Sequence, residues 1–546
     1  MNIKQVSLLA IITLTGITSL AGCANSDAKV KSIKQEAKIM EQADISSLDS
    51  VKISDVGALE TVNNSQEGLY RLQSGTEVKP GLAKKIVTPT NNGTVYTFKL
   101  RSNLKWSNGD KLTAKDFEST WKRAVTPATK STNAYQFLPL KNAAAIEKGK
   151  MSSSKLGVKA INATTLRVTL ERPTAYFKYL CASTPFLPQD ANLVKKYGKA
   201  YGTDSTKTVY SGPFTVKNWS TSKNTWELVK NPNYWDKDNV KLDKVVFETT
   251  KDPQTALSLY QSGKLDNIIL AGQQAAQLKA KAGFQSYSNG ETDYIAYNFK
   301  TKALRNANIR KAISLTVDRQ SLVRNVLKNG SKAPYGMAPE DVAKNPSTGA
   351  DFAKDGSTSQ SVQFNPTLAK KYWAKGLAQL KTKNLTLNMV CYDVDSFKNS
   401  AEFVQSSAEK YLPGLKININ VEPKLQAITK MQQKSGYDLG FSNWIASYPE
   451  LSEYYQLLDS GNANNAGNYS NKTFDKYYDK AMTNDSMNAN QRYQDFKRAE
   501  KVAADDQAVL VVNQGQVARL NNPNLKGVSY AAASGISLKN AYMTDK

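Results

Sequence analysis

Residues 93–125 hold the pattern that most constrains the fold of this chain. Tyr96 and Phe98 alternate with polar residues, which predicts a strand with one buried face. Asn108 and Gly109 follow and indicate a tight turn, because glycine accepts a positive φ without a steric clash. We expect these residues to build the fold rather than to carry chemistry.

A helix is expected directly after this turn. Thr113 is followed three residues later by Asp116, which is typical of a capped helix start. Phe117 and Trp121 lie four residues apart, so they share one face of the helix. We expect that face to be buried.

The length and composition indicate a globular protein with more than one domain. A chain of 546 residues exceeds what a single hydrophobic core usually serves, so two or three domains are expected. Hydrophobic residues make up 40% of the chain, which favours a globular protein over a disordered one.

The formal charge of +26 comes mainly from lysines scattered along the whole chain. A nucleic-acid-binding protein more often gathers Lys and Arg into a patch with stacking aromatic residues, so no nucleic-acid partner is expected. A solvated cationic surface is the better interpretation. Such a surface attracts anionic cell-wall polymers or acidic ligands by long-range steering.

The absence of histidine excludes several kinds of chemistry. A Ser-His-Asp triad, a Cys-His pair and a His-ligated zinc site all need a residue that the chain lacks. Catalysis by carboxylates alone, as in glycosidases, stays open at this point.

The amino terminus has the features of a secretory signal. Lys4 precedes a mostly apolar run over residues 6–20, shorter than the roughly 20 residues that a membrane-spanning helix needs. The run ends in Leu-Ala-Gly-Cys at residues 20–23, which resembles a lipoprotein signal-peptidase box. By this resemblance Cys23 becomes the first mature residue and carries a diacylglyceryl group on its sulfur. An ordinary signal peptide with an incidental cysteine is the alternative.

A polar segment rich in Lys, Glu, Asp and Ser follows, and we interpret residues 23–43 as a flexible tether. A tethered lipoprotein is typical of a Gram-positive surface, where no outer membrane retains a soluble binding protein. Cys181 and Cys391 lie far apart in the sequence. We therefore expect two buried free thiols, with a disulfide as the alternative.

Short segments in a fixed order along the chain resemble the oligopeptide-binding family of ABC-transporter solute-binding proteins. No single segment is specific to the family. The resemblance rests on their occurring in the same order as in the family, over nearly the whole mature chain. They are Glu-Gly-Leu at 67–69, Phe-Lys-Leu-Arg at 98–101, Lys-Trp-Ser-Asn-Gly-Asp at 105–110, Leu-Thr-Ala-Lys-Asp-Phe at 112–117, Lys-Asn-Pro-Asn-Tyr-Trp at 230–235 and Arg-Lys-Ala-Ile at 310–313.

The resemblance implies an α/β protein with the two-lobed periplasmic-binding-protein type II fold of the peptide-binding cluster and an extra subdomain. A ligand that contacts both lobes then favours their closed arrangement. The expected segments are a lipoprotein signal peptide (1–22), the tether (23–43), the first lobe (44–67, 205–296 and 509–546), the extra subdomain (68–204) and the second lobe (297–508).

The function implied by the resemblance is capture of oligopeptides in an interlobe cleft and their delivery to an ABC permease. We expect a lipid-anchored monomer on the outer face of the cell membrane, with no enzymatic activity, cofactor or metal; ATP hydrolysis belongs to partner subunits. Two alternatives stay open. One is a protein of the same fold for another solute, such as a signalling peptide, a cell-wall peptide or a sugar. The other is a cationic surface adhesin.

The resemblance also places the ligand between two main-chain walls. In the family, an extended peptide pairs with strand segments on both sides, and such backbone hydrogen bonds do not depend on the side chains. Trp444 and Tyr448 are candidates for lining side-chain pockets, with core positions as the alternative. The matching wall residues in this sequence are Leu69, Tyr70 and Arg71 on one side and Asn443, Trp444 and Ile445 on the other.

Ser447 is the departure from the family pattern. It stands where the family has an aspartate that pairs with the α-ammonium of the peptide, whereas Tyr448 and Glu450 match. A serine supplies no charge, and losing a desolvated charged partner costs about 2–5 kcal/mol. Either Glu450 or another acid takes over, or free amino termini are not tightly held. A slip of the alignment by one residue is the remaining alternative.

Overall fold

The computed structural model describes residues 33–53, 55–355, 358–532 and 535–545. Its contacts divide the chain into two compact units, Met1–Lys34 and Gln35–Lys546, and the fold below belongs to the second. None of the helices that the structure describes is long and apolar enough to cross a membrane. Cys23 and the expected signal peptide lie outside the described residues.

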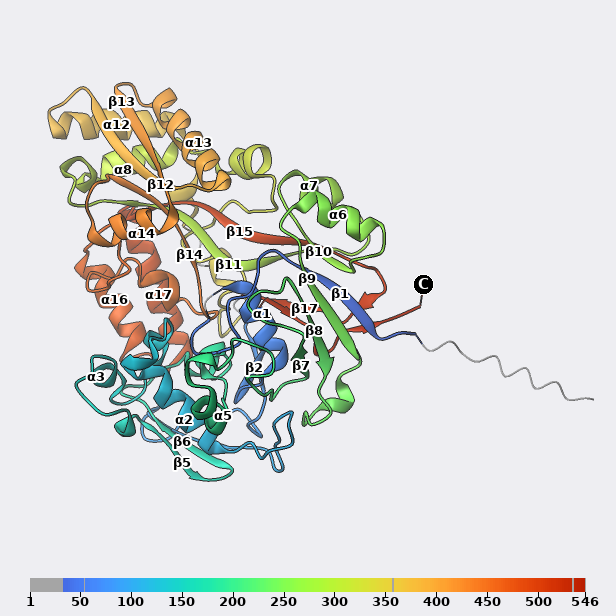
Figure 1. Cartoon of the computed structure of the whole chain (residues 1–546). Coiled ribbons are helices and arrows are strands. Elements are labelled where there is room, and N and C mark those ends of the chain that lie inside the picture. The colour runs from blue at the N-terminus through green and yellow to red at the C-terminus, as the bar shows by residue number, and fades with distance from the viewer. Residues whose placement is uncertain (1–32, 54, 356–357, 533–534, 546) are drawn as a thin grey trace, which may run out of the picture. The chain divides into compact units, whose positions relative to one another are not determined.

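A ten-stranded mixed sheet runs through the second unit (Figure 1). β1 is parallel to β9 and β10, and β12 is parallel to β13 and β14, whereas the other neighbours are antiparallel. In sheet order the strands are β13 (Leu415–Glu422), β12 (Leu385–Tyr392), β14 (Leu439–Ile445), β11 (Phe284–Tyr297), β15 (Val509–Asn521), β10 (Asn267–Leu270), β1 (Glu36–Glu41), β9 (Lys244–Thr249), β8 (Thr225–Lys230) and β7 (Phe214–Lys217).

The two long central strands, β11 and β15, join the two halves of the sheet. β11 pairs with β14 from Glu291 onward, while β15 pairs with β10 from Ala518 onward. The pairing between β11 and β15 is irregular between Ser288 and Thr292, at the junction of the two halves. The chain crosses between the halves along these strands, as expected for two lobes that share a sheet.

The half with β12, β13 and β14 is packed on both faces. Ile295 and Tyr297 of β11 belong to one hydrophobic cluster, and Tyr294 and Ala296 belong to another. Successive side chains of a strand point to opposite faces, so each cluster covers one side of the sheet. The helices of this half are α8 (Ala307–Leu315), α9 (Arg319–Ser321), α10 (Phe352–Asp355), α11 (Ser359–Val362), α12 (Pro366–Leu380), α13 (Asp395–Tyr411), α14 (Lys424–Gln433), α15 (Ser452–Tyr455), α16 (Lys472–Met482) and α17 (Ala489–Asp505).

The other half is built around β1, whose side chains also serve two clusters. Ala37 and Ile39 pack with the aromatic residues of β8 and β9, while Met40 packs with β10 and β15. The elements added to this half are α1 (Val56–Ser65), α6 (Pro253–Gln261), α7 (Gln273–Leu278), β16 (Leu525–Lys526), β17 (Ser529–Ala531), β18 (Gly535–Ser537) and β19 (Tyr542–Met543).

A three-stranded sheet in the order β4-β6-β5 forms the core of the extra subdomain. The predicted strand and helix are confirmed: Thr113 and Asp116 form a capping box, and Phe117 and Trp121 are fully buried. The Trp121 Nε1 donates to the Phe186 carbonyl at 2.9 Å, which fixes the helix on its aromatic neighbours. The elements of this region are β2 (Tyr70–Ser74), β3 (Glu77–Pro80), β4 (Val95–Lys99), α2 (Ala114–Val125), α3 (Ala143–Glu147), β5 (Val158–Asn162), β6 (Thr165–Thr169), α4 (Phe177–Leu180) and α5 (Ala191–Tyr197).

The prediction that the tether extends to residue 43 is wrong. β1 begins at Glu36 and pairs in parallel with β9 along its whole length, from Glu36 with Lys244 to Glu41 with Thr249. Ala37, Ile39 and Met40 are buried, because the strand is inserted between β9 and β10. A six-residue strand flanked by charged residues resembles a polar linker in composition, and its neighbours are distant in the sequence.

Cys181 and Cys391 are both buried and free, as expected. Cys181 packs in the core of the extra subdomain, and Cys391 packs in the core around β12. Burial raises the pKa of the Cys391 thiol to about 11, so it stays protonated and inert at neutral pH.

Candidate ligand-binding site

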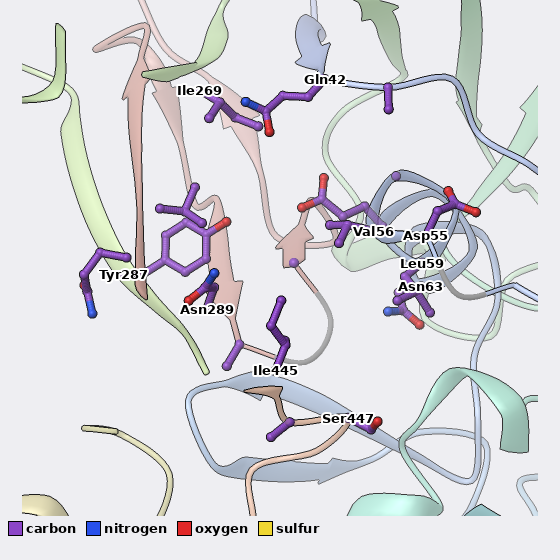
Figure 2. A pocket seen from close by; sticks show the side chains of 18 of the residues that line it. Gln42, Asp55, Val56, Leu59, Asn63, Ile269, Tyr287, Asn289, Ile445 and Ser447 are labelled. Atoms are coloured by element: carbon purple, nitrogen blue, oxygen red, sulfur yellow. The ribbon is translucent and has the colours of Figure 1, made fainter. Parts of the chain in front are cut away.

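A cavity of about 1330 Å³ opens between the strands at the junction of the two halves and the extra subdomain. Figure 2 shows Gln42 and Ile269 at one end and Ile445 and Ser447 at the other. Two further groups of labelled side chains face one another across the cavity: Asp55, Val56, Leu59 and Asn63 from α1 and its start, and Tyr287 and Asn289 from β11.

The end of β14 and the loop after it form a wall without charged side chains. Ile445, Ser447 and Tyr448 all line the cavity, and the Ile445 side chain is 46% exposed. The Ser447 Oγ lies 2.9 Å from the Tyr135 hydroxyl, which comes from the extra subdomain. We call residues 443–448 the neutral wall.

Tyr448 is buried and stacks on Tyr176 with their ring centroids 5.3 Å apart. Its ring thus closes one end of the cavity and also belongs to the core of the extra subdomain. The two interpretations of Tyr448 from the sequence, as a lining residue and as a core residue, therefore both describe its position.

Glu450 does not reach the cavity. Its carboxylate pairs with Arg492 at 2.7 Å, and both side chains are largely buried. A carboxylate that is already neutralised by a buried guanidinium is a poor partner for the ammonium of a ligand.

Glu453 is the acid nearest to Ser447, and the sequence did not single it out. The Glu453 Oε2 accepts a hydrogen bond from the Ser447 backbone N–H at 3.0 Å. Burial raises the pKa of Glu453 to about 7, although the hydrogen bond from Ser447 opposes this shift. The carboxyl lies directly behind the serine, on a helix that begins five residues downstream in the chain.

The outer edge of β14 is open along most of its length. β12 pairs with β14 only at Leu439 and Gly440, so residues 441–445 have no strand partner on this side among the described residues. The Ala446 N–H donates to Gly290 of β11. The backbone N–H and C=O groups of successive strand residues point to alternate sides. Those of Asn443 and Ile445 therefore point away from β11, toward the open edge.

A second cavity of about 270 Å³ lies along this open edge. Asn443, Trp444 and Ile445 line it, and Ile445 lines the large cavity too. Trp444 is half-buried, and its Nε1 has no hydrogen-bond partner in the part of the chain that the structure describes. The three β14 residues expected at the ligand thus line the smaller cavity together, and Ile445 also lines the large one.

The other expected wall is not brought to the large cavity. Leu69 and Tyr70 are buried, and the Leu69 carbonyl already accepts from the N–H groups of Gly81 and Ala83. The Tyr70 N–H donates to the Cys181 carbonyl. Of strand β2, it is Leu72 that lines the large cavity.

Arg71 has a structural partner as well. It pairs with Glu67 at 2.8 Å, and the Glu67 carboxylate also accepts from the Tyr234 hydroxyl. The Arg71 guanidinium and its hydrogen bond hold the pKa of Glu67 below its usual range despite complete burial. The Glu-Gly-Leu segment therefore anchors the lobe in this structure, and its backbone is occupied by neighbours.

An acidic wall faces the cavity from β1, α1 and β15. Glu41, Asp55 and Glu60 line it together with Arg519, and we use this name for these four residues. Arg519 donates to Glu60 at 3.1 Å and to Asn267 at 2.8 Å. The sequence does not indicate this wall, because the expected tether includes Glu41 and because Arg519 lies more than 450 residues from the three acids.

Burial raises the pKa of Glu41 to about 8, and repulsion from Glu60 adds to this shift while Arg519 opposes it. The Glu41 carboxyl is therefore mostly protonated at neutral pH. In the described ranges no group of three or more His, Cys, Asp or Glu side chains is arranged to hold a metal ion.

Residues 77–466 match the model of the bacterial extracellular solute-binding proteins, family 5 (middle). The chain belongs to this family. Its members bind solutes outside the cytoplasm and are not enzymes.

Individual family 5 proteins are similar over nearly the whole chain. The dipeptide-binding protein of Lactococcus lactis subsp. cremoris (strain MG1363) is 35% identical, and the alignment covers 99% of each chain. The solved structure of Listeria monocytogenes OppA bound to peptide is 34% identical, with a TM-score of 0.76 over 94% of this chain and 100% of that one. The pheromone receptor PrgZ, solved with its mode of peptide binding, is 32% identical, with a TM-score of 0.77 over the same shares.

These likenesses show the mixed α/β periplasmic-binding-protein fold of the OppA structures, including the extra subdomain. The fold class inferred from the sequence is confirmed. The segment boundaries beyond the start of β1 stay predictions.

Proposed function

We propose that this chain is the peptide-binding component of an ABC transporter and that it holds an extended peptide along the outer edge of β14. The relatives described above are named for a dipeptide ligand, solved with a bound peptide, or solved for their mode of peptide binding. Delivery to a permease follows from the transport role of such binding proteins, with ATP hydrolysis in partner subunits.

The observation that carries the proposal is the open edge of β14 beside the large cavity. The backbone groups of Asn443 and Ile445 point outward, and Ile445 lines both cavities. An extended peptide adds a strand to such an edge through main-chain hydrogen bonds, which accept many sequences. The large cavity, at about 1330 Å³, exceeds the roughly 300–1,000 Å³ of small-molecule pockets.

Substitution Ile445→Pro tests this docking mode. Proline removes the Ile445 N–H, which points to the open edge and is not needed by the pairing with β11, so the fold is retained. We expect calorimetry with tri- and tetra-alanine to show an affinity loss of about tenfold or more, equal for both peptides. Ile445→Ala is the matched control, because it removes the side chain and keeps the N–H. Wild-type affinity in Ile445→Pro would exclude docking at this edge.

For the amino terminus of the peptide, we propose that Glu453 supplies the charge that Ser447 lacks. The Glu453 carboxyl accepts from the Ser447 backbone, whereas Glu450 is engaged by Arg492. Binding of a peptide and of its N-acetylated form, compared by calorimetry, measures this hold on the ammonium. Glu453→Gln is expected to bring the two affinities together, while Glu450→Gln leaves their ratio unchanged. An unchanged ratio in Glu453→Gln contradicts the assignment.

We further propose a lipid anchor at Cys23 on the outer face of the cell membrane. The Leu-Ala-Gly-Cys box supports it, and residues 24–35 leave a linker of at most about 40 Å before β1. Cys23→Ser is expected to release the protein from the membrane fraction into the medium, whereas Cys181→Ser does not. Retention of Cys23→Ser on the membrane would contradict the anchor.

A further inference from the structure

The cavity and the rest of the chain carry opposite charge. The full sequence has 73 Lys and Arg against 47 Asp and Glu, and its formal charge is +26. Among the described residues that line the large cavity, four are acidic, one is an arginine and none is a lysine. The four acids are Glu41, Asp55, Glu60 and Asp395.

The acidic wall is only partly neutralised from within. Arg519 pairs with Glu60 at 3.1 Å, which leaves Glu41 and Asp55 without a cationic partner among the described residues. Asp55 accepts from the Ala58 N–H and from the Ser46 hydroxyl, both of them neutral donors. Three acidic residues and one arginine thus line the cavity at this end.

Two members of the acidic wall, Glu41 and Arg519, have incomplete hydrogen bonding, and Glu41 is the acid of the two. Its side chain is 4% exposed, its Oε1 accepts from the Gln42 N–H, and its Oε2 has no partner in the described part of the chain. A buried polar atom without a partner is unfavourable, so such an atom at a binding cavity points to a missing donor. Gly57 lets the carboxyl lie against the first turn of α1, because a Cβ there would come within 3.0 Å of the Glu41 Cδ.

Apolar side chains lead from the neutral wall to this acidic end. Val56 is 60% exposed although it lines the cavity, Leu59 lies near it on α1, and Ile269 lines the cavity beside Gln42 (Figure 2). A long cationic side chain places its methylene groups along such a surface and extends its charged head to the polar end.

We propose that the acidic wall is a subsite for a cationic side chain of the bound peptide, a lysine or an arginine. The head group donates to Glu41 and Asp55, with Glu60 and Arg519 behind them, and the aliphatic stem packs on Val56. The subsite rests on the proposed peptide binding and adds a preference to it. The remaining cationic surface repels such ligands at long range, so the preference is local to the cavity.

The subsite also gives a role to the acid at this buried position. With a cation bound, the carboxyl ionises and gains a charge-assisted hydrogen bond, whereas in the empty protein it keeps its proton. Arg519 does not fill this role in this structure: its Nη atoms bind Glu60 and Asn267, and no hydrogen bond joins its Nε to Glu41 among the described residues.

The test is a lysine scan of trialanine with the full mature protein. Three peptides carry lysine at one position each, and three matched peptides carry norleucine, which has the same stem without the charge. All six keep a free α-ammonium, so each pair isolates the side-chain charge. We expect one lysine peptide to bind the wild type about tenfold more tightly than its norleucine partner. In Glu41→Gln and in Asp55→Asn the lysine preference is expected to fall to threefold or less. Each variant loses one ionic partner of the lysine, which removes about half of the free energy behind the preference.

Two choices keep the result interpretable. Asparagine is as good a helix N-cap as aspartate, so Asp55→Asn keeps the start of α1. Asp44→Asn is the matched control: Asp44 is exposed, pairs only with Lys251 in the described salt bridges and lies outside the cavity lining. This control is expected to keep the full lysine preference.

The outcomes separate the subsite from the proposed function. Equal binding of lysine and norleucine peptides at every position overturns the subsite and leaves peptide binding intact. If none of the six peptides binds, the proposed function itself fails. If Glu41→Gln instead abolishes the difference between free and N-acetylated peptides, the acidic wall holds the α-ammonium and the side-chain assignment is overturned.

Discussion

The two walls of the cavity differ in what they offer to a ligand. The neutral wall, residues 443–448, presents backbone groups at an open strand edge and carries no charge. The acidic wall, formed by Glu41, Asp55, Glu60 and Arg519, presents carboxyl groups whose backbones are occupied in β1, α1 and β15. Backbone groups accept many peptides, whereas carboxyl groups select by charge, so generality and preference are assigned to opposite sides of one cavity.

The largest effect is expected from removing the cation of the acidic wall. Arg519→Met leaves Glu60 buried without its partner, and breaking a buried ion pair in this way costs about 3–5 kcal/mol of unfolding free energy. Denaturant unfolding measures it. The double variant Glu60→Gln with Arg519→Met is expected to recover most of the loss, because no unpaired charge remains.

Lys501→Met is the control for this comparison. Lys501 forms an exposed pair with Asp505, and such pairs contribute less than about 1 kcal/mol. If Arg519→Met and Lys501→Met lowered the unfolding free energy equally, the pairing of Arg519 with Glu60 would not stabilise the acidic wall.

The next effect concerns Glu41 and pH. Its pKa lies at about 8 in the folded protein and at 4.5 in the unfolded chain, so between these values the folded state binds more protons. The unfolding free energy therefore decreases as pH rises from 4.5 to 8. Glu41→Gln removes this dependence, and its unfolding free energy relative to the wild type is expected to rise by about 3–4 kcal/mol between pH 5 and pH 8. Denaturant unfolding at both pH values measures the change, with Asp44→Asn as control.

If the difference in unfolding free energy between wild type and Glu41→Gln stayed constant from pH 5 to pH 8, Glu41 would be ionised throughout this range. The acidic wall would then carry its full charge in the empty protein, and its contrast with the neutral wall would be larger than inferred.

The smallest effect is expected from adding charge to the neutral wall. Ser447→Asp places a carboxylate where Ser447 now contacts the Tyr135 hydroxyl. The ratio of affinities for a free and an N-acetylated peptide is expected to rise about threefold, because Glu453 behind it partly opposes a second charge. Ser447→Asn is the control of equal size without charge, and an equal ratio in both variants would contradict an electrostatic origin.

Much of the fold could be predicted from local patterns. The strand, turn and capped helix of residues 93–125 appear as expected, because alternation, a capping box and a glycine turn act over a few residues. The order of the segments along the chain was sufficient to place it in its family. The resemblance placed a ligand wall at Asn443 to Ile445; the structure shows an open strand edge there, and the role of these residues in binding stays a prediction.

The remaining features depend on residues that meet only in the folded chain. The composition of β1 alone indicates a linker, because its buried character comes from parallel neighbours more than 200 residues away. The expected wall at Leu69, Tyr70 and Arg71 is occupied by partners such as Gly81 and Cys181, which no local pattern reveals.

The sequence by itself determined the fold class and the family through the resemblance carried by the order of its segments, and its composition excluded histidine chemistry. The tertiary structure decided which carboxyl groups are paired, which are left facing the cavity, and that a cationic chain encloses an acidic hollow. Charge interactions depend on distance and burial, and the chain brings Glu41, Asp55, Glu60 and Arg519 together only by closing the sheet.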